Sequence, residues 1–416
     1  MALSTEALRS EAAKRWEVAD IFRQAGESYR RNNPLPCSHL KVMRAIEVCR
    51  TSYLGGHVQK CDTCGFEQHS YNSCRNRHCP KCQTLTKARW VEDRKAELLS
   101  VPYFHNVFTL PHELNPLALC NKKAIYSMLF TAVSETLLHF GRNNLGGVMG
   151  FTAILHTWDQ RLLDHIHLHC VIAGGALSID KTRWIQTKDN YLFNVEALSM
   201  VFRGKFIDHL EKTHAKGVLK FPGNTAKYAT HEEFSGLIKD LRSKDWVVFS
   251  KKPFAAPQEV LDYIGRYTHR VAISNNRIVD IQDGKVTFTY RDRKDNGTLK
   301  LKTLDAVEFI RRFLLHVLPE GFMKIRHFGF LSNRHKKEKV HLCRELIGDN
   351  NPVPAYRTGR PERAKKTAGE LMLELTGIDI TRCPCCREGT MTIIMEMPYP
   401  SRRTLMRPCT AYADSS

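Results

Sequence analysis

The N-terminal stretch, residues 5–31, repeats apolar side chains every three or four positions, which is the spacing of one helix face. The repeat falls on Leu8, Ala12, Trp16, Ala19 and Phe22. It predicts an amphipathic helix that ends at the helix-breaking segment NNPLP. Further helices are predicted over residues 38–53, 83–99, 117–140, 195–213 and 257–272.

Other stretches combine β-branched and aromatic residues, which is typical of strands. Strands are predicted over residues 101–111, 148–158, 165–175 and 244–254. Residues 275–292 predict a hairpin, because Asp283-Gly284 suits a two-residue turn between two alternating runs. In 165–175 the alternation is sharp, and it places three histidines on one strand face and apolar residues on the other.

Composition narrows the class of protein. The chain has 416 residues, of which 42% are hydrophobic, and this predicts several domains with a sizeable core. Its net charge of +20 favours a polyanionic partner such as nucleic acid. No run of 18 apolar residues occurs and the first residues do not resemble a signal peptide, so we expect no membrane and a cytoplasmic, nucleoid-associated protein of bacterial type. Fourteen cysteines in such a compartment point to metal rather than to disulfides.

Two C-x2-C pairs lie close together in residues 57–82. Each pair places two thiolates on one tight turn, and two such turns complete a tetrahedral zinc site. We therefore predict a structural Zn²⁺ ion with the ligands Cys61, Cys64, Cys79 and Cys82.

The same region leaves an alternative open. Cys74 and His78 could replace one of the two pairs, or they could join His57 in a second site. The spacing fits each of these ligand sets, because each offers thiolate or imidazole donors that are close together in the sequence.

The C-terminal CPCC sequence supplies only half of a further site, through Cys383, Cys385 and Cys386. Cys409 or Cys343 could complete it. The surrounding residues 334–416 are basic and rich in turn-forming residues, and their charged runs fit either a DNA-binding surface or ordinary solvated surface.

The histidine strand predicts a second kind of metal site. His167 and His169 share a strand face, and two imidazoles two positions apart can bind one divalent ion. The open coordination positions would accept a phosphate and polarise it. A third ligand is expected, either His156 on the preceding strand or His105 on the first strand.

The stretch YIGRY offers nucleophiles for such a phosphate. Tyr263 and Tyr267 are four residues apart and lie on one face of the predicted helix. Nearby Arg266, His269 and Arg270 would supply positive charge for DNA binding. Taken alone, the tyrosines could equally be part of an apolar core stripe.

These motifs together resemble a known family. HIHLHCVIAGG and YIGRY resemble the histidine strand and the two-tyrosine helix of HUH endonucleases. SCRNRHCPKCQ resembles the zinc-binding domain of rolling-circle insertion-sequence transposases, and IRHFGFLSNRHKK and LTGIDITRCPCC resemble their C-terminal signatures. The resemblance covers about residues 20–390.

The resemblance implies an α/β (α+β) fold with a central antiparallel sheet and flanking helices. It implies three parts: a helical and zinc-binding DNA-binding domain over 1–100, an HUH catalytic domain over 101–333, and a basic C-terminal region over 334–416. His167 and His169 would hold Mg²⁺ or Mn²⁺, and Tyr263 or Tyr267 would attack single-stranded DNA at an element end. The product would be a 5′-phosphotyrosine and a free 3′-hydroxyl.

Two other functions remain open at this point. A zinc-containing DNA-binding protein without catalytic activity would bury the tyrosines, and its histidines would bind nothing. A relaxase or replication initiator would use the same chemistry in another biological role. No GxxxxGK[ST] motif occurs, so strand separation would fall to a host helicase and the replication machinery.

Overall fold

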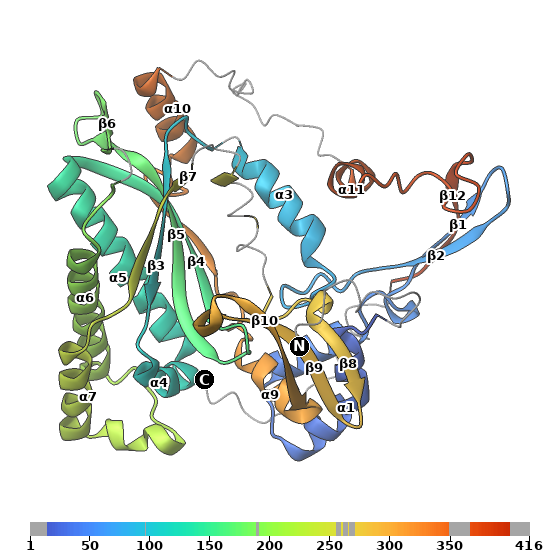
Figure 1. Ribbon diagram of the computed structural model, residues 1–416, viewed down its shortest axis with the longest axis horizontal. Helices are drawn as coiled ribbons and strands as arrows, with labels where there is room; N and C mark the ends of the chain where they lie inside the picture. Colours follow the sequence, from blue (N-terminus) through green and yellow to red (C-terminus); the bar gives the residue numbers. More distant parts are fainter. Residues whose placement is uncertain are drawn as a thin grey trace.

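The structure, a computed structural model, describes residues 15–95, 97–188, 191–254, 259–260, 265, 271–348 and 367–399. These residues form a mixed fold of antiparallel sheets with flanking helices (Figure 1). The predicted fold class, with a central antiparallel sheet, is therefore confirmed.

The central sheet has the strand order β11-β4-β5-β3-β7, and β6 pairs with β5 outside this path. Its strands are β3 (Tyr103–Thr109), β4 (Gly147–Trp158), β5 (Asp164–Ser178), β6 (Trp184–Gln186), β7 (Val248–Phe254) and β11 (Ile325–Gly329). Strands β4 and β5 are the longest, and a short connection around Asp159 joins them into a hairpin. The carboxylate of Asp159 accepts hydrogen bonds from the backbone N–H groups of Arg161 and Leu163, which holds this turn.

Two further sheets have three strands each. One has the order β10-β9-β8, formed by β8 (Ile278–Gln282), β9 (Lys285–Asp292) and β10 (Thr298–Asp305). The other has the order β12-β1-β2, formed by β1 (Gly56–Cys61), β2 (Glu67–Tyr71) and β12 (Met391–Met397). In the second sheet, a strand from the C-terminal part of the chain therefore completes a hairpin from its N-terminal part.

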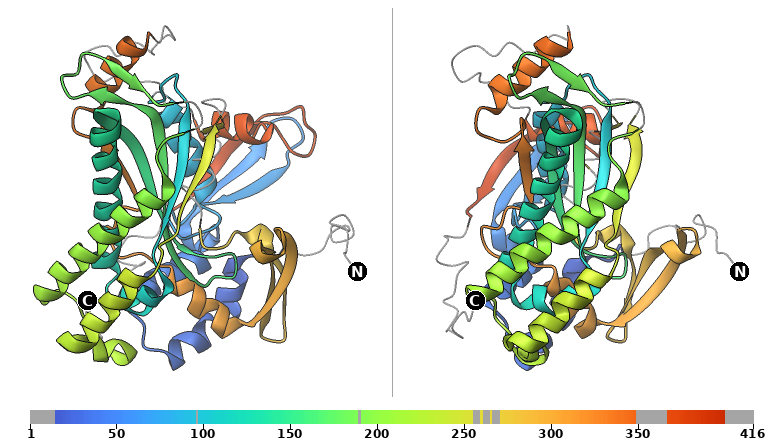
Figure 2. Two further views of the ribbon diagram at one scale, coloured as in Figure 1. Left: turned by 60° about the vertical axis from the view of Figure 1, so that its left-hand side comes forward. Right: turned by 90° about the vertical axis from the view of Figure 1, so that its left-hand side faces the viewer.

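Helices cover one face of the central sheet (Figure 2). They are α4 (Asn115–Cys120), α5 (Lys122–Phe140), α6 (Val195–Ala215) and α7 (His231–Ser243). Helix α6 begins where the Asn194 side chain accepts a hydrogen bond from the backbone N–H of Ala197. The other helices are α1 (Val18–Asn32), α2 (Cys37–Glu47), α3 (Gln83–Lys95), α9 (Ala306–Leu315), α10 (Lys336–Ile347) and α11 (Ala368–Thr376).

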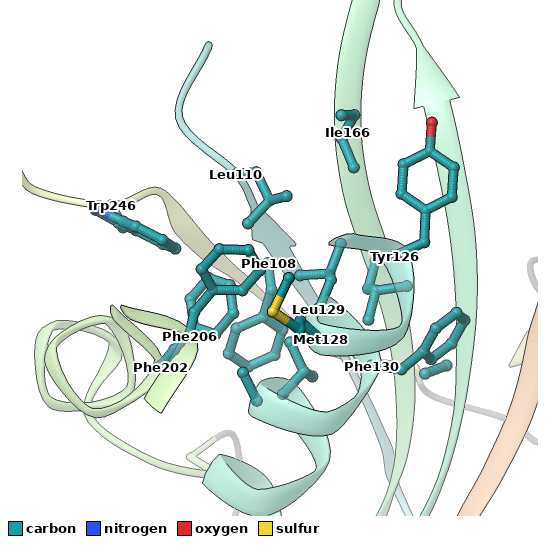
Figure 3. Close-up of a cluster of buried hydrophobic side chains, with 14 of the residues drawn as sticks. Phe108, Leu110, Tyr126, Met128, Leu129, Phe130, Ile166, Phe202, Phe206 and Trp246 are labelled. Atoms are coloured by element: carbon teal, nitrogen blue, oxygen red, sulfur yellow. The ribbon is translucent and has the colours of Figure 1, made fainter. Parts of the chain in front are cut away.

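The largest core lies between this helical layer and the sheet. Apolar side chains of β3 and β5, such as Phe108 and Ile166, meet those of α5 and α6, such as Leu129 and Phe202 (Figure 3). All four are almost fully buried. This packing fixes which face of β5 points toward the helices, and it leaves the histidine face on the other side of the sheet.

A second core joins distant parts of the chain. Helices α1 and α2 pack against α9 and the β8–β10 sheet, through residues such as Phe22 and Phe313, whose rings meet edge to face at 5.3 Å. The N-terminal helices and residues 272–317 therefore share one apolar core. Figure 1 shows α1 beside β8 and β9.

The predicted hairpin at 275–292 is confirmed. Its turn residues Asp283 and Gly284 have φ values of 52° and 72°, which are the positive values that a two-residue turn of this kind requires. Each of the four predicted strands is also present, with ends shifted by a few residues. Helices are present at the other predicted positions, although α1 begins only at Val18, α2 and α3 end earlier, and 117–140 divides into α4 and α5. Residues 5–14 of the first predicted helix lie outside the described residues.

The three-part domain organisation stays a prediction, and the packing crosses both of its boundaries. The α1–α2 core includes residues 272–317, and β12 pairs with β1. Among the described residues, no helix combines the length and the apolar character needed to cross a membrane.

Candidate active site and metal centres

The imidazoles of His105, His156, His167 and His169 gather on the face of the central sheet opposite the α5–α6 layer. In the strand register His156 of β4 stands opposite His167 of β5, and β3 on the other side of β5 contributes His105. The alternate residues of β5 pack into the main core. The face assignment predicted from the alternating pattern of β5 is therefore confirmed.

Three of these imidazoles form a compact group. One ring nitrogen each from His156, His167 and His169 lies within 4.8 Å of the others. His167 Nε2 and His169 Nε2 are 3.1 Å apart. The three side chains are buried, with exposed fractions of 3%, 6% and 7%. Neutral imidazoles at this separation are a donor set that fits one divalent ion.

Hydrogen bonds orient two of the rings. His167 Nδ1 lies 2.7 Å from the backbone carbonyl oxygen of His165, so its N–H donates there and Nε2 is the nitrogen that carries the lone pair for a metal. His169 Nδ1 lies 3.0 Å from His105 Nε2. Both rings therefore turn their Nε2 atoms toward the same point.

His105 supports this group from the neighbouring strand. Its ring stacks on that of His169, with 5.2 Å between centroids. Burial, and then the positive charge of Lys251, lowers the pKa of His105 to about 4, so the ring is neutral near pH 7. Of the two candidates for a third ligand, the geometry groups His156 with His167 and His169, whereas His105 contacts the far nitrogen of His169.

Helix α3 lies over the same face of the sheet. Arg94 Nη1 is 3.4 Å from His327 Nε2 of β11, and His327 Nδ1 is 2.9 Å from the hydroxyl of Thr152 on β4. Gly265 also approaches α3, since a Cβ at Gly265 would lie 2.9 Å from Val91 Cγ2. Of the stretch YIGRY, only this glycine belongs to the described residues.

The predicted nucleophiles and their basic neighbours lie outside the described residues. They are Tyr263, Tyr267, Arg266, His269 and Arg270. Their roles stay predictions. The nearby Val260 is described, and it is buried against the sheet together with Ile154 and Val171.

The first cysteine cluster brings together Cys49, Cys74, Cys79 and Cys82. Cys82 Sγ lies 3.5 Å from Cys49 Sγ and 3.5 Å from Cys74 Sγ. A tetrahedron of Zn–S bonds has S–S edges of about 3.8 Å, so the cluster fits Zn²⁺. All four side chains contact the α1–α2 core, and the site therefore lies where three parts of the chain meet.

The second cluster brings together Cys61, Cys64, Cys383 and Cys386. Cys61 Sγ lies 3.7 Å from Cys386 Sγ, and Cys64 Sγ lies 3.6 Å from Cys383 Sγ. These separations again match the edges of a zinc–thiolate tetrahedron and are far longer than a disulfide bond.

The predicted grouping of Cys61, Cys64, Cys79 and Cys82 into one site is therefore wrong. Pairing of β12 with β1 brings a C-terminal cysteine pair to the first C-x2-C turn. The second C-x2-C turn packs on the α1–α2 core, where Cys49 completes its group.

Of the other candidate zinc ligands, some belong to a cysteine cluster and others lie apart from both clusters. Cys74 joins the first cluster, as one alternative proposed, but His78 and His57 belong to neither cluster. Cys343 is buried in the core beside β5, and Cys385 is exposed next to the second cluster. Cys409 lies outside the described residues.

The sequence patterns did not include Cys49 among the candidate ligands. It fell inside a predicted helix, whereas α2 ends at Glu47 and Cys49 lies in the turn that follows. Cys49 has no partner at C-x2-C spacing. The available signal was the uneven C-x4-C-x2-C series formed by Cys74, Cys79 and Cys82, which lacks a fourth thiol.

Comparisons with known proteins match most of the chain. Residues 150–339 match the family described as "Putative transposase", and residues 21–110 match the "Transposase zinc-binding domain". The chain is 49% identical to "Putative transposase y4qJ" of Sinorhizobium fredii over 381 residues, which are 91% of this chain and 94% of that one. It is 28% identical over 350 residues to "Transposase for insertion sequence element IS801" of Pseudomonas savastanoi pv. phaseolicola, which covers 83% of this chain and 81% of that one. No solved structure matches the chain.

The two matched regions contain two of the three side-chain groups completely and the third only in part. The histidine group on β4 and β5 lies within residues 150–339, and the first cysteine cluster lies within residues 21–110. The second cysteine cluster has two members within 21–110 and two beyond both matched regions.

Proposed function

Because the chain belongs to the rolling-circle insertion-sequence transposases of the HUH type, we propose that it cleaves and rejoins single-stranded DNA at the ends of a mobile element through a 5′-phosphotyrosine. The buried group of His156, His167 and His169 supports this proposal most strongly, since its three ring nitrogens are close enough to hold one divalent ion.

The donor set also bears on which ion is used. Of the two predicted ions, Mn²⁺ accepts nitrogen ligands more readily than Mg²⁺, which keeps oxygen ligands and several of its waters. We therefore favour Mn²⁺ as the working ion. When bound, such an ion would stabilise negative charge on the scissile phosphate. His167 and His169 act by holding their Nε2 atoms toward that point, because their Nδ1 atoms are already hydrogen-bonded.

In the cleavage step a tyrosine attacks phosphorus. The phenolic oxygen of Tyr263 or Tyr267 forms the new P–O bond, the bond from phosphorus to the 3′ oxygen breaks, and a proton ends on that oxygen. The free 3′-hydroxyl can later attack the phosphotyrosine and release the tyrosine, so rejoining needs no ATP. Gly265, the described residue between the two tyrosines in the sequence, approaches α3, and α3 lies on the histidine side of the sheet.

The proposal extends to binding partners and location. Arg266, His269 and Arg270 would bind the DNA backbone, in keeping with the net charge of +20. A host helicase would separate the strands, and the protein would act in the bacterial cytoplasm on the nucleoid. The zinc-binding part over 1–100 and the basic region over 334–416 would flank the catalytic part.

A labelled oligonucleotide tests the proposal. The protein is incubated with Mn²⁺ and a single strand that carries the element terminus, and the products are separated under denaturing conditions. DNA labelled at its 3′ end should migrate with the protein, whereas DNA labelled at its 5′ end should become a shorter strand that a polymerase can extend. A chelator should abolish both products. Binding without any adduct would instead identify a DNA-binding protein without cleavage activity.

We also propose that Cys49, Cys74, Cys79 and Cys82 hold the structural Zn²⁺ ion of the zinc-binding domain. Cys74→Ser should remove one zinc ion per chain. It should also lower Tm by roughly 10 °C, because the cluster supports the core shared by α1, α2 and residues 272–317.

Metal analysis and calorimetry would measure the two effects. Cys120→Ser is the matched control, because Cys120 is half-buried in α4 and belongs to neither cluster. Loss of stability in Cys74→Ser without loss of zinc would reject this ligand set.

His105 should act as a positioning residue for His169. In His105→Ala the Mn²⁺ concentration for half-maximal adduct formation should rise about 10- to 100-fold, because an outer partner that orients a ligand is lost. The rate at saturating Mn²⁺ should change much less. His105→Gln, which keeps an acceptor near His169 Nδ1, should recover part of the affinity.

The readout is the metal dependence of adduct formation in each variant. A purely structural role for His105 predicts a lower maximal rate with an unchanged Mn²⁺ midpoint, and that result would contradict the positioning role.

A further inference from the structure

The second cysteine cluster is built from two turns of similar design. In the first turn the backbone N–H groups of Thr63 and Cys64 both point at Cys61 Sγ, at 3.4 Å. In the second turn the N–H of Cys385 points at Cys383 Sγ and that of Gly389 points at Cys386 Sγ, each at 3.4 Å. Backbone N–H groups around a sulfur stabilise the thiolate form that binds a metal.

The two turns also contact each other directly. The Asp62 carboxylate accepts a hydrogen bond of 2.8 Å from the backbone N–H of Thr390, and the N–H of Asp62 donates to the Thr390 carbonyl at 3.1 Å. Gly389 lies so close to Cys61 Sγ that a Cβ at this position would collide with it. The second turn therefore fits against the first with its four sulfurs facing one another.

Strand pairing sets this arrangement. The antiparallel register of β1 and β12 runs from Gly56 opposite Met397 to Cys61 opposite Met391. The cysteine turns lie directly beyond the same end of this ladder. Figure 1 shows β1, β2 and β12 together, apart from the central sheet.

We propose that Cys61, Cys64, Cys383 and Cys386 bind a second Zn²⁺ ion, which joins the two ends of the chain into one zinc ribbon. The site goes beyond the proposed DNA chemistry and does not depend on it. Its sulfur separations of 3.6 Å and 3.7 Å match a Zn–S₄ tetrahedron, and all four ligands are protein thiolates, so the ion is structural.

The ribbon has a consequence for the whole chain. Its paired ligands are 319 and 325 residues apart, so binding of this ion closes a loop that contains the entire central sheet. Closing so long a loop costs chain entropy, and the metal–thiolate bonds supply the free energy that offsets it. Helix α11, which precedes Cys383 in the chain and contacts α3, is thereby connected to the ribbon.

Zinc content in the full-length protein tests the site. Cys64→Ser and Cys386→Ser should each lose one zinc ion per chain relative to the unaltered protein. The double variant Cys64→Ser/Cys386→Ser should also lose only one, because both residues bind the same ion. Cys64→Ser/Cys74→Ser should lose two, and Cys385→Ser should lose none although it neighbours the site.

Thiol alkylation tests the same site without any substitution. In the zinc-loaded protein the exposed Cys385 should react quickly with iodoacetamide, whereas Cys64, which is also exposed, should be protected by its bond to zinc. A chelator should release Cys64, Cys383 and Cys386 together. Mass spectrometry of the digested protein gives the extent of reaction at each cysteine.

Two results would overturn the proposal. One is a loss of two zinc ions in Cys64→Ser/Cys386→Ser, which would place the two cysteines at different ions. The other is alkylation of Cys64 in the zinc-loaded protein as fast as that of Cys385. Neither readout involves DNA, so each stands apart from the outcome of the cleavage assay.

Discussion

Replacing both Tyr263 and Tyr267 with phenylalanine is expected to abolish the covalent protein–DNA adduct completely. Phenylalanine keeps the ring and removes only the phenolic oxygen, which is the atom that bonds to phosphorus in the proposed step. The measurement is the fraction of 3′-labelled single strand that migrates with the protein under denaturing conditions, at saturating Mn²⁺.

The single variants assign the two tyrosines. If one tyrosine cleaves first, Tyr263→Phe and Tyr267→Phe will differ strongly in adduct yield on a single element end. Tyr191→Phe is the control, because Tyr191 is 53% exposed and lies outside every group described above. An adduct that persists in the double variant would show that another residue is the nucleophile.

The second large effect is expected from the histidine pair. The double variant His167→Ala/His169→Ala should lower the rate of adduct formation by about 10³-fold or more, because metal stabilisation of a phosphoryl transition state contributes several kcal/mol. Both rings belong to the buried histidine group on the sheet, which offers one ligand nitrogen from each of three imidazoles. Loss of both rings therefore removes two of the three candidate metal ligands.

A separate readout and a control variant distinguish loss of metal from loss of fold. In the presence of a chelator, the double variant should bind the same oligonucleotide about as well as the unaltered protein. The two histidines lie on the sheet face opposite the main core, so their replacement leaves that core intact. His139→Ala is the control, because His139 lies on α5 in the layer opposite the histidine face. A double variant that still forms the adduct at a similar rate would remove the histidines from the mechanism.

The histidine face was predictable because it depends on one strand alone. Alternation along β5 determines which side chains share a face, whatever the strand pairs with. The identity of the neighbours was not predictable in the same way. His156 joined the group through the β4–β5 register, and His105 contacted His169 rather than joining as a ligand, because β3 packs on the other side of β5.

The cysteines illustrate the opposite case. C-x2-C spacing predicted that Cys61, Cys64, Cys79 and Cys82 belong to zinc sites, because two cysteines on one tight turn are a local feature, and each of them lies in a cluster of four thiols. Spacing did not reveal which turns meet. A sequence separation of more than three hundred residues between Cys61 and Cys386 carries no local signal.

The sequence by itself determined which reactive side chains this protein carries and how they are spaced: alternating histidines on a strand, paired cysteines on turns, and two tyrosines four residues apart. These features follow from the backbone geometry of single elements. Only the tertiary structure decided the membership of each group, because pairing of β12 with β1 and of β4 with β5 depends on contacts between distant segments. Those contacts form where apolar faces of separate elements pack together, and the local pattern of one segment does not specify its partner.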